Sequence, residues 1–263
     1  MFQTWHNLEI IIVNDGSTDE NTIKIINEFE NVKLINQKNL GLPAARNNGA
    51  KVAKGNYLFF LDSDDWIEND SLNLIYKFQK KIKKFSYVYT QIVTEGDFHK
   101  TINKKYNYFE QLFFNQIPYC IFIDMDLWKK YGSYDEDMKL GYEDWELNIR
   151  LGSKNIFGYK LDLPLFHYNV SNEGMLISTS SKNHTKIWKT IKNKNRSLYK
   201  INNLIKIWKN WRKSSSNYPL ILFFIWYFLI TYLPDNITSN IFIYLRNLKW
   251  VFVRNSFQIN LEK

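Results

Sequence analysis

Apolar runs alternate with stretches of helical spacing through the first part of the chain. Residues 8–13 and 57–61 are apolar without helical periodicity, which is typical of strands buried on both faces. A shorter apolar run lies between them at residues 32–35, and a helical stretch follows each of the first two runs. The order strand, helix, strand, helix, strand predicts a parallel sheet with crossover helices, as in α/β domains.

The pattern downstream is less regular. The spacing predicts an amphipathic helix over residues 71–83 and a strand over residues 87–93. Residues 94–119 are aromatic and irregular, and no element is predicted there. After this irregular stretch, we expect short elements at residues 121–123 and 125–131, and then a helix over residues 142–151. Two further short elements are expected at residues 156–161 and 165–168.

The last part of the chain has a different pattern. Residues 182–213 carry eleven Lys or Arg, no acid, and apolar residues at mostly helical spacing, which is typical of a helix that binds a membrane surface. Residues 214–234 have no charge, but their strongly apolar centre, residues 220–233, is short for a membrane span. We expect an interfacial or re-entrant hairpin. The alternatives are a full crossing and a helix pair packed on the rest of the protein.

Charge divides the chain in the same way. Residues 174–263 hold 15 basic and two acidic residues, a net charge of +13, and the whole chain has +9, so residues 1–173 carry −4. A basic tail suits nucleic acid or anionic lipid, and the apolar spacing favours lipid. The single cysteine, Cys120, excludes an internal disulfide and a cysteine-rich zinc site.

Carboxylates follow two of the predicted strands. Asp15 comes after the first apolar run. The last of the three runs is followed by a group of acids: Asp62, Asp64 and Asp65. Ligands bind beyond the carboxyl ends of parallel strands, and hard divalent cations prefer carboxylate oxygens, so these acids are candidate ligands of a cation that carries phosphate. The alternative is a solvated acidic turn that caps the next helix.

Three further residues are candidates for chemistry. Glu143 and Asp144 begin the predicted helix at residues 142–151, where acids either complement the helix dipole or supply a general base. Arg46 either pairs with the acidic strand ends or reaches a phosphate. The lone His167 is expected to have a core or surface role. P-loop, GxGxxG and Ser-His-Asp patterns are absent from the sequence, which argues against nucleoside triphosphatase, dinucleotide-binding and hydrolase functions.

Three stretches of the sequence resemble the inverting glycosyltransferases of family 2, which have the GT-A fold. They occur in family order between about residues 5 and 170: LEIIIVNDGSTDE, NLGLPAARNNGAKVAKGNYLFFLDSDDW and GYEDWELNIRL. The resemblance implies a Rossmann-like mixed α/β sheet in a glycosyltransferase domain over residues 1–180. A basic and hydrophobic, membrane-associating helical tail is expected over residues 181–263.

The resemblance also implies roles for individual residues. Asp144, with Glu143 alongside, would be the base that deprotonates the acceptor hydroxyl. Mn²⁺ or Mg²⁺ is the implied cofactor, with Asp64 and Asp65 as its ligands. The residues expected to bind the nucleotide sugar are Asp15, Asp62, Asp64 and Arg46.

The chain departs from the family pattern at its start. Family members usually have a strand and a helix ahead of the segment that resembles residues 1–10, and that strand lies between the next strand and the one that leads into the acidic motif. We therefore expect an N-terminally truncated sheet, in which residues 8–13 and 57–61 lack the strand between them. Truncation, a strand from another chain, or a different closure of the sheet would each account for this.

The resemblance and the tail together predict a membrane-associated bacterial transferase. It would move a sugar from a nucleotide-sugar donor, a UDP-sugar in our interpretation, to a hydroxyl of a lipid-linked or growing polysaccharide in cell-envelope assembly. We expect it at the cytoplasmic face of the membrane, peripheral or monotopic, on an anionic surface and without a nucleic-acid partner. The alternative is a truncated, inactive fragment that only associates with membranes.

Overall fold

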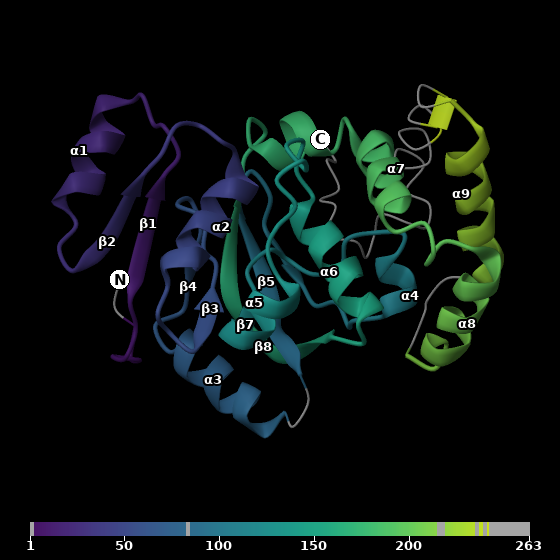
Figure 1. Ribbon diagram of the computed structural model, residues 1–263, viewed down its shortest axis with the longest axis horizontal. Coiled ribbons are helices and arrows are strands. Elements are labelled where there is room, and N and C mark those ends of the chain that lie inside the picture. The colour runs from purple at the N-terminus through teal and green to yellow at the C-terminus, as the bar shows by residue number, and fades with distance from the viewer. Residues whose placement is uncertain (1–2, 83–84, 215–218, 235–236, 239–240, 242–263) are drawn as a thin grey trace.

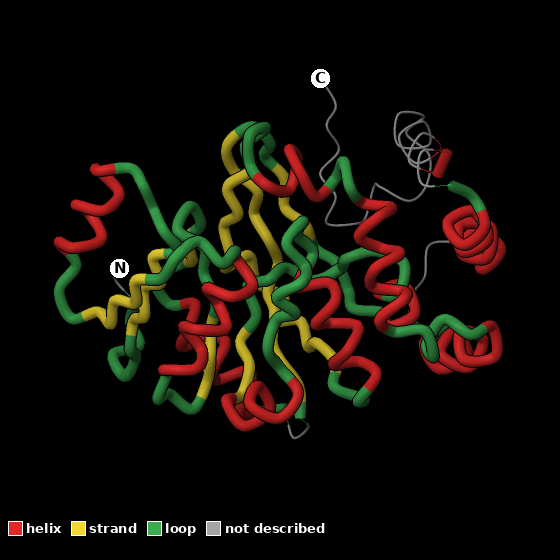
Figure 2. Tube along the Cα trace, turned by 45° about the horizontal axis from the view of Figure 1, so that its top comes forward, coloured by secondary structure: helices red, strands yellow, loops and turns green. Residues whose placement is uncertain are grey.

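The computed structural model describes residues 3–82, 85–214, 219–234, 237–238 and 241. It shows a mixed α/β fold around a six-stranded sheet, with helices packed on both sides (Figures 1 and 2). Along the sheet the order is β3-β7-β5-β8-β4, and β6 pairs with β5. The bounds of these strands are β3 Tyr57–Phe59, β4 Trp66–Ile67, β5 Ser86–Gly96, β6 Lys100–Ile102, β7 Phe122–Asp124 and β8 Phe157–Val170.

The long parallel pair β5 and β8 organises this sheet. The register between them shifts at Gln91, and such irregularities increase local twist. Before the shift, β5 pairs with the antiparallel β7, which in turn pairs with β3. After it, β5 pairs with β6, and β8 pairs with β4. The two strands that flank the acidic motif, β3 and β4, therefore lie at opposite ends of the strand order.

A second, two-stranded parallel sheet stands apart. β1 (Ile10–Asn14) pairs with β2 (Val32–Asn36), and α1 (Glu20–Glu28) connects them. Within the described part of the chain, β2 is the only sheet neighbour of β1, and β7 is the only one of β3. The two strands that we expected to lack a strand between them thus belong to different sheets. Helix α2 (Leu42–Val52) leads from the small sheet to β3.

Two hydrophobic clusters fix the helices. Helix α3 (Ser71–Lys81) inserts Ile75 into the smaller cluster, beside Val88 and Leu165 of the main sheet. The larger cluster contains residues of α4 (Tyr108–Gln111), α5 (Met125–Tyr131) and α6 (Glu143–Ser153). Much of it comes from the irregular region for which no element was predicted, with Tyr106, Tyr108, Phe109, Leu112, Phe113 and Ile117 all buried.

The C-terminal section folds onto this larger cluster. It contains a π-helix (Leu176–Ser180), α7 (His184–Lys194), α8 (Ile201–Trp211) and α9 (Leu220–Tyr232). Trp188, Leu204 and Phe223, one from each α-helix, are fully buried in the cluster. The inner faces of these helices therefore pack on the rest of the protein, as in the helix-pair alternative. Among the described helices, none is both long and apolar enough to span a bilayer. The rest of the predicted tail, residues 242–263, lies outside the described residues.

Candidate active site

The three acids after β3 converge in space. β3 ends at Phe59, and buried Phe60 anchors the turn by packing on Trp128 and Tyr134. One oxygen from each carboxylate lies within 4.8 Å of the others: Asp62, Asp64 and Asp65. An all-oxygen donor set of this size fits a hard divalent cation.

Electrostatics also favours a cation here. Asp65 is buried and accepts hydrogen bonds from the backbone N–H of Asn169, at 2.8 Å, and from the Tyr119 hydroxyl. Burial, opposed by these bonds and reinforced by repulsion from Asp64 and Asp62, raises the pKa of Asp65 to about 7. Burial likewise raises the pKa of Asp64. A bound cation would compensate the charge that burial disfavours.

Arg46 connects this acidic cluster with the start of α6. Its guanidinium contacts both oxygens of Asp62 at 2.8 Å and also binds the Glu143 carboxylate. The same group lies over the Tyr119 ring at 4.2 Å, and its side chain is only 7% exposed. Of the two possibilities for Arg46, the structure shows the pairing with acids.

Asp144 lies beside Glu143 but has a different environment. It is buried, its Oδ2 accepts a hydrogen bond from the Asn115 side-chain amide at 2.9 Å, and its Oδ1 accepts one from the backbone N–H of Trp145 at 2.7 Å. Burial and the neighbouring Glu143 raise the pKa of Asp144 to about 7, against these hydrogen bonds and the charge of Arg46. A carboxylate that titrates near neutrality suits a general base.

Asp15 braces a loop. Its carboxylate accepts hydrogen bonds from the Gln37 amide at 2.7 Å and from the backbone N–H groups of Leu40 and Gly41 at 2.8 and 2.9 Å. Gly41 has φ 95°, a conformation that favours glycine, and it precedes α2, which carries Arg46. Asp15 therefore fixes the entry to the helix that supplies the central arginine.

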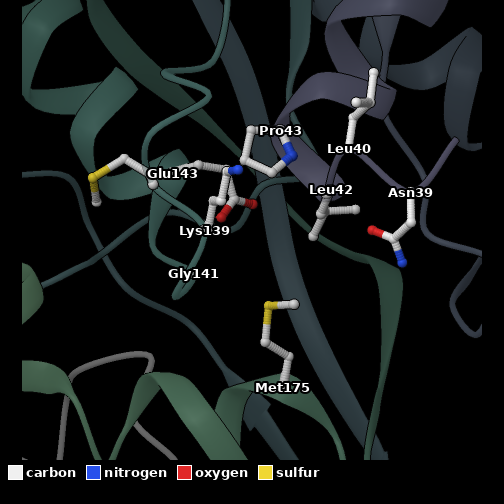
Figure 3. Close-up of a pocket in the computed structure, with 10 residues that line it drawn as sticks. Asn39, Leu40, Leu42, Pro43, Lys139, Gly141, Glu143 and Met175 are labelled. Atoms are coloured by element: carbon white, nitrogen blue, oxygen red, sulfur yellow. The ribbon is translucent and has the colours of Figure 1, made fainter. Parts of the chain in front are cut away.

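A cavity of about 270 Å³ opens next to Glu143 (Figure 3). It lies between the loop before α2 and the loop before α6, and Met175 closes one side. Its lining is mainly apolar, with Lys139 and Glu143 as the charged residues: Asn39, Leu40, Gly41, Leu42, Pro43, Met138, Lys139, Gly141, Glu143 and Met175. No sequence motif had marked Met138, Lys139 or Met175, and only the fold brings Met175 to Glu143.

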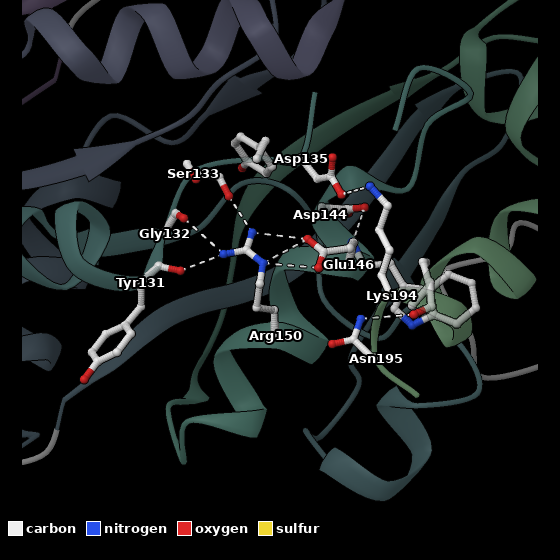
Figure 4. Close-up of polar contacts among 12 residues, drawn as sticks. Tyr131, Gly132, Ser133, Asp135, Asp144, Glu146, Arg150, Lys194 and Asn195 are labelled. Atoms are coloured by element: carbon white, nitrogen blue, oxygen red, sulfur yellow. Dashed lines mark hydrogen bonds and ion pairs between the residues drawn. The ribbon is translucent and has the colours of Figure 1, made fainter. Parts of the chain in front are cut away.

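Hydrogen bonds from Arg150 of α6 fix the start of the loop before this helix (Figure 4). Arg150 binds Glu146 one turn away and donates to the carbonyls of Tyr131, Gly132 and Ser133. This loop carries Tyr134, whose ring lies 5.3 Å from the Arg46 guanidinium.

His167 lies outside this network: it forms hydrogen bonds with Glu68 and Glu95 at 2.9 Å and stacks on Trp66. It is not among the three candidate metal ligands.

Comparison with known proteins identifies the family. The model of glycosyl transferase family 2 matches residues 2–138, over half of the chain. The chain belongs to this family. A glycosyltransferase, GlyA of Streptococcus pneumoniae, is 49% identical over 79 residues, which cover 28% of this chain and 11% of GlyA. Chondroitin synthase of Pasteurella multocida is 41% identical over 92 residues, covering 34% of this chain and 9% of the synthase. The chain thus matches only a small part of the length of these relatives.

Solved structures show the same fold. Residues 1–349 of S. aureus TarS, in a complex with UDP-GlcNAc, superpose with a TM-score of 0.57 at 18% identity, covering 73% of this chain and 59% of that one. A longer TarS structure gives 0.59 at 16% identity, with coverage of 89% and 42%. The fold is therefore the GT-A fold that the resemblance implied.

Proposed function

We propose that this family 2 glycosyltransferase moves a sugar, with inversion, from a UDP-sugar to a hydroxyl group of a growing or lipid-linked glycan. One observation carries the proposal. Arg46 joins Asp62 of the acidic cluster to Glu143, the neighbour of the buried Asp144. A set of cation ligands and a candidate base thereby belong to one connected site beside the cavity.

In this mechanism Asp144 accepts the proton of the acceptor hydroxyl. The acceptor oxygen then forms a bond to the anomeric carbon of the donor while the bond to the diphosphate oxygen breaks, and a single displacement inverts that carbon. Mn²⁺ or Mg²⁺, bound by Asp64 and Asp65 with Asp62 alongside, would neutralise the diphosphate as it leaves. Arg46 holds Asp62 and Glu143 in place throughout.

The donor is proposed by analogy and by fit. The TarS structure is described as a complex with UDP-GlcNAc, and an acidic cluster with a divalent cation suits a nucleoside diphosphate. In our proposal Asp15 contacts the base of the nucleotide, at the start of the loop that it braces.

Replacing the proposed base separates binding from chemistry. We expect Asp144→Asn to abolish transfer from UDP-sugars, while calorimetry still shows binding of UDP with Mn²⁺. A screen of UDP-sugars by mass spectrometry would follow the transfer. Turnover near that of the unmodified protein would rule out Asp144 as the base. Donor binding without turnover of any UDP-sugar in the unmodified chain would favour the alternative, an inactive fragment.

We also propose that the enzyme acts as a peripheral protein on the cytoplasmic face of an anionic membrane. Support comes from four residues on the outer side of α9, which are 48–67% exposed and recur at helical spacing: Ile221, Ile225, Phe228 and Tyr232. Helix α8 contributes the exposed Lys206 and Lys209, and Figure 1 places both helices at the end of the molecule opposite β1 and β2. Exposed apolar side chains near basic ones suit such a surface.

Vesicle flotation tests this location. The protein should float with vesicles that contain phosphatidylglycerol, and Phe228→Glu should weaken the binding. Ile25→Glu, at a similarly exposed position on α1, is the matched control and should leave it unchanged. Equal flotation of the Phe228→Glu variant would contradict the proposed surface. Retention on DNA that vesicles do not compete with would favour a nucleic-acid partner.

A further inference from the structure

A chain of buried amides runs from Asp144 to the C-terminal helices. Asn115 donates from its amide nitrogen to Oδ2 of Asp144 at 2.9 Å, and its own oxygen accepts a bond from Gln111. Gln111 in turn accepts from the backbone of Gln116, whose amide exchanges two hydrogen bonds with the backbone of Asn107. All four amide residues are at most 5% exposed.

The far end of this chain is attached to α8. The Asn107 side chain donates to the carbonyls of Trp211, at 3.2 Å, and Ser214, at 2.7 Å. The backbone carbonyl of Gln111 also accepts a hydrogen bond from the indole N–H of Trp145, the residue after Asp144, at 2.6 Å. Buried amides are costly unless they are bonded, so each member restricts the orientation of the next. The Asn115 amide is thus fixed with its nitrogen toward the carboxylate.

We propose that Asn115 is a positioning residue for Asp144. Asn115 donates a hydrogen bond to Oδ2, while Oδ1 accepts one from the backbone N–H of Trp145. Because both oxygens are hydrogen-bonded, the Asn115 contact fixes the orientation of the carboxylate plane. The amide chain makes this orientation depend on the packing of α8 against α4, a part of the molecule well outside the acidic cluster.

The inference has consequences for the proton affinity of Asp144. The groups that act on it electrostatically are Glu143 beside it, Arg46 from α2, Tyr134 from the loop before α6 and Tyr168 from β8. Against this background the Asn115 bond favours the ionised form. Its loss should raise the pKa of Asp144 by about 1 to 2 pH units, as expected for one hydrogen bond to a charged group.

The first measurement is independent of turnover. Aspartate labelled with ¹³C at the carboxyl carbon is titrated by NMR in the metal-free protein, and the Asp144 signal is the one lost in Asp144→Asn. Asn115→Ala should move its midpoint upward, and the nearly isosteric Asn115→Asp should move it further. Asn73→Ala, which removes an amide bond to Asp70 at the start of α3, should leave it in place. An unchanged midpoint in both Asn115 variants would overturn the inference.

The second measurement follows UDP release from UDP-GlcNAc with Mn²⁺, and it rests on the proposed function. Asn115→Ala should lower kcat at pH 7 roughly 10- to 100-fold and leave KM for the donor unchanged. An inactive Asp144→Asn together with an unmoved titration would defeat the role of Asn115 alone. A moved titration with an active Asp144→Asn would defeat the base assignment and keep the positioning contact.

Discussion

Removing the Arg46 guanidinium should destabilise the protein strongly. Arg46→Met keeps most of the apolar volume of the side chain but leaves two carboxylates without their counter-charge. The Glu143 side chain is 6% exposed and the Asp62 side chain 25%, so one charge is left in the interior and the other near the surface. Breaking a buried ion pair by removing one partner costs about 3–5 kcal/mol, and the partial exposure of Asp62 places our expectation near 3.

Urea unfolding of the metal-free protein at neutral pH measures this cost. Arg196→Met is the matched control, because Arg196 is exposed, and its effect should stay within about 0.5 kcal/mol. The double variant Arg46→Met with Glu143→Gln should be less destabilised than the sum of the single variants, since the second change removes the stranded charge. A loss below about 1 kcal/mol for Arg46→Met, or strictly additive effects, would refute the interpretation of Arg46 as the link between the two halves of the site.

Three further perturbations test other parts of the structure. Burial lowers the pKa of His184 from 6.5 to about 4, so the unfolded chain binds the proton more readily than the folded protein does. The free energy of unfolding should therefore fall by up to about 3 kcal/mol as the pH drops from above 6.5 to 4. His184→Gln should flatten this pH dependence, as measured by urea unfolding. The pKa of Asp65 is raised instead, so its ionised form destabilises the metal-free protein at pH 8 and Asp65→Asn should stabilise it there. The same variant should abolish stabilisation by Mn²⁺ in thermal melts, and a wild-type response to Mn²⁺ would exclude Asp65 as a ligand. Phe223→Ala should cost about 3–5 kcal/mol, against less than about 0.5 for the exposed Phe228→Ala, and equal costs would contradict the packing of α9.

The acidic site was predictable because its signals are local. An apolar run that ends in Asp62, Asp64 and Asp65 indicates a strand and a ligand group together, and Glu143 with Asp144 lies at a helix start that the spacing predicts. Arg46 could be predicted only as one of two possibilities. Whether Arg46 pairs with acids or binds a phosphate depends on how α2 packs against α6. The order of residues along each helix does not determine this packing.

Asn115 and Tyr119 were missed for a different reason. They lie in the irregular stretch at residues 94–119, where the described elements are a strand end, the short β6 and a single helical turn, α4. Their burial comes from long-range contacts, such as the packing of Tyr119 on Phe166 and the hydrogen bond of Asn115 to Asp144. The periodicity of a sequence reports on the faces of regular elements and carries no signal for such contacts.

The tail shows the limit of amphipathic patterns. An apolar stripe beside basic residues is the same signal whether the stripe meets lipid or protein. The structure buries Trp188, Leu204 and Phe223 in the protein core and leaves Ile221, Ile225, Phe228 and Tyr232 exposed on α9. Only the second set remains available for the proposed membrane surface.

The cation-dependent binding of a nucleoside diphosphate tests the central claim most directly. Isothermal titration calorimetry of UDP should show binding in the presence of Mn²⁺ and a large loss of affinity when EDTA replaces it. Asp64→Ala should lose the Mn²⁺-dependent part of the affinity, while Asp126→Ala, at an acid on α5 outside the cluster, should keep it. UDP binding that is equally tight with and without Mn²⁺, and unchanged in Asp64→Ala, would contradict an acidic cluster that holds the donor through a cation.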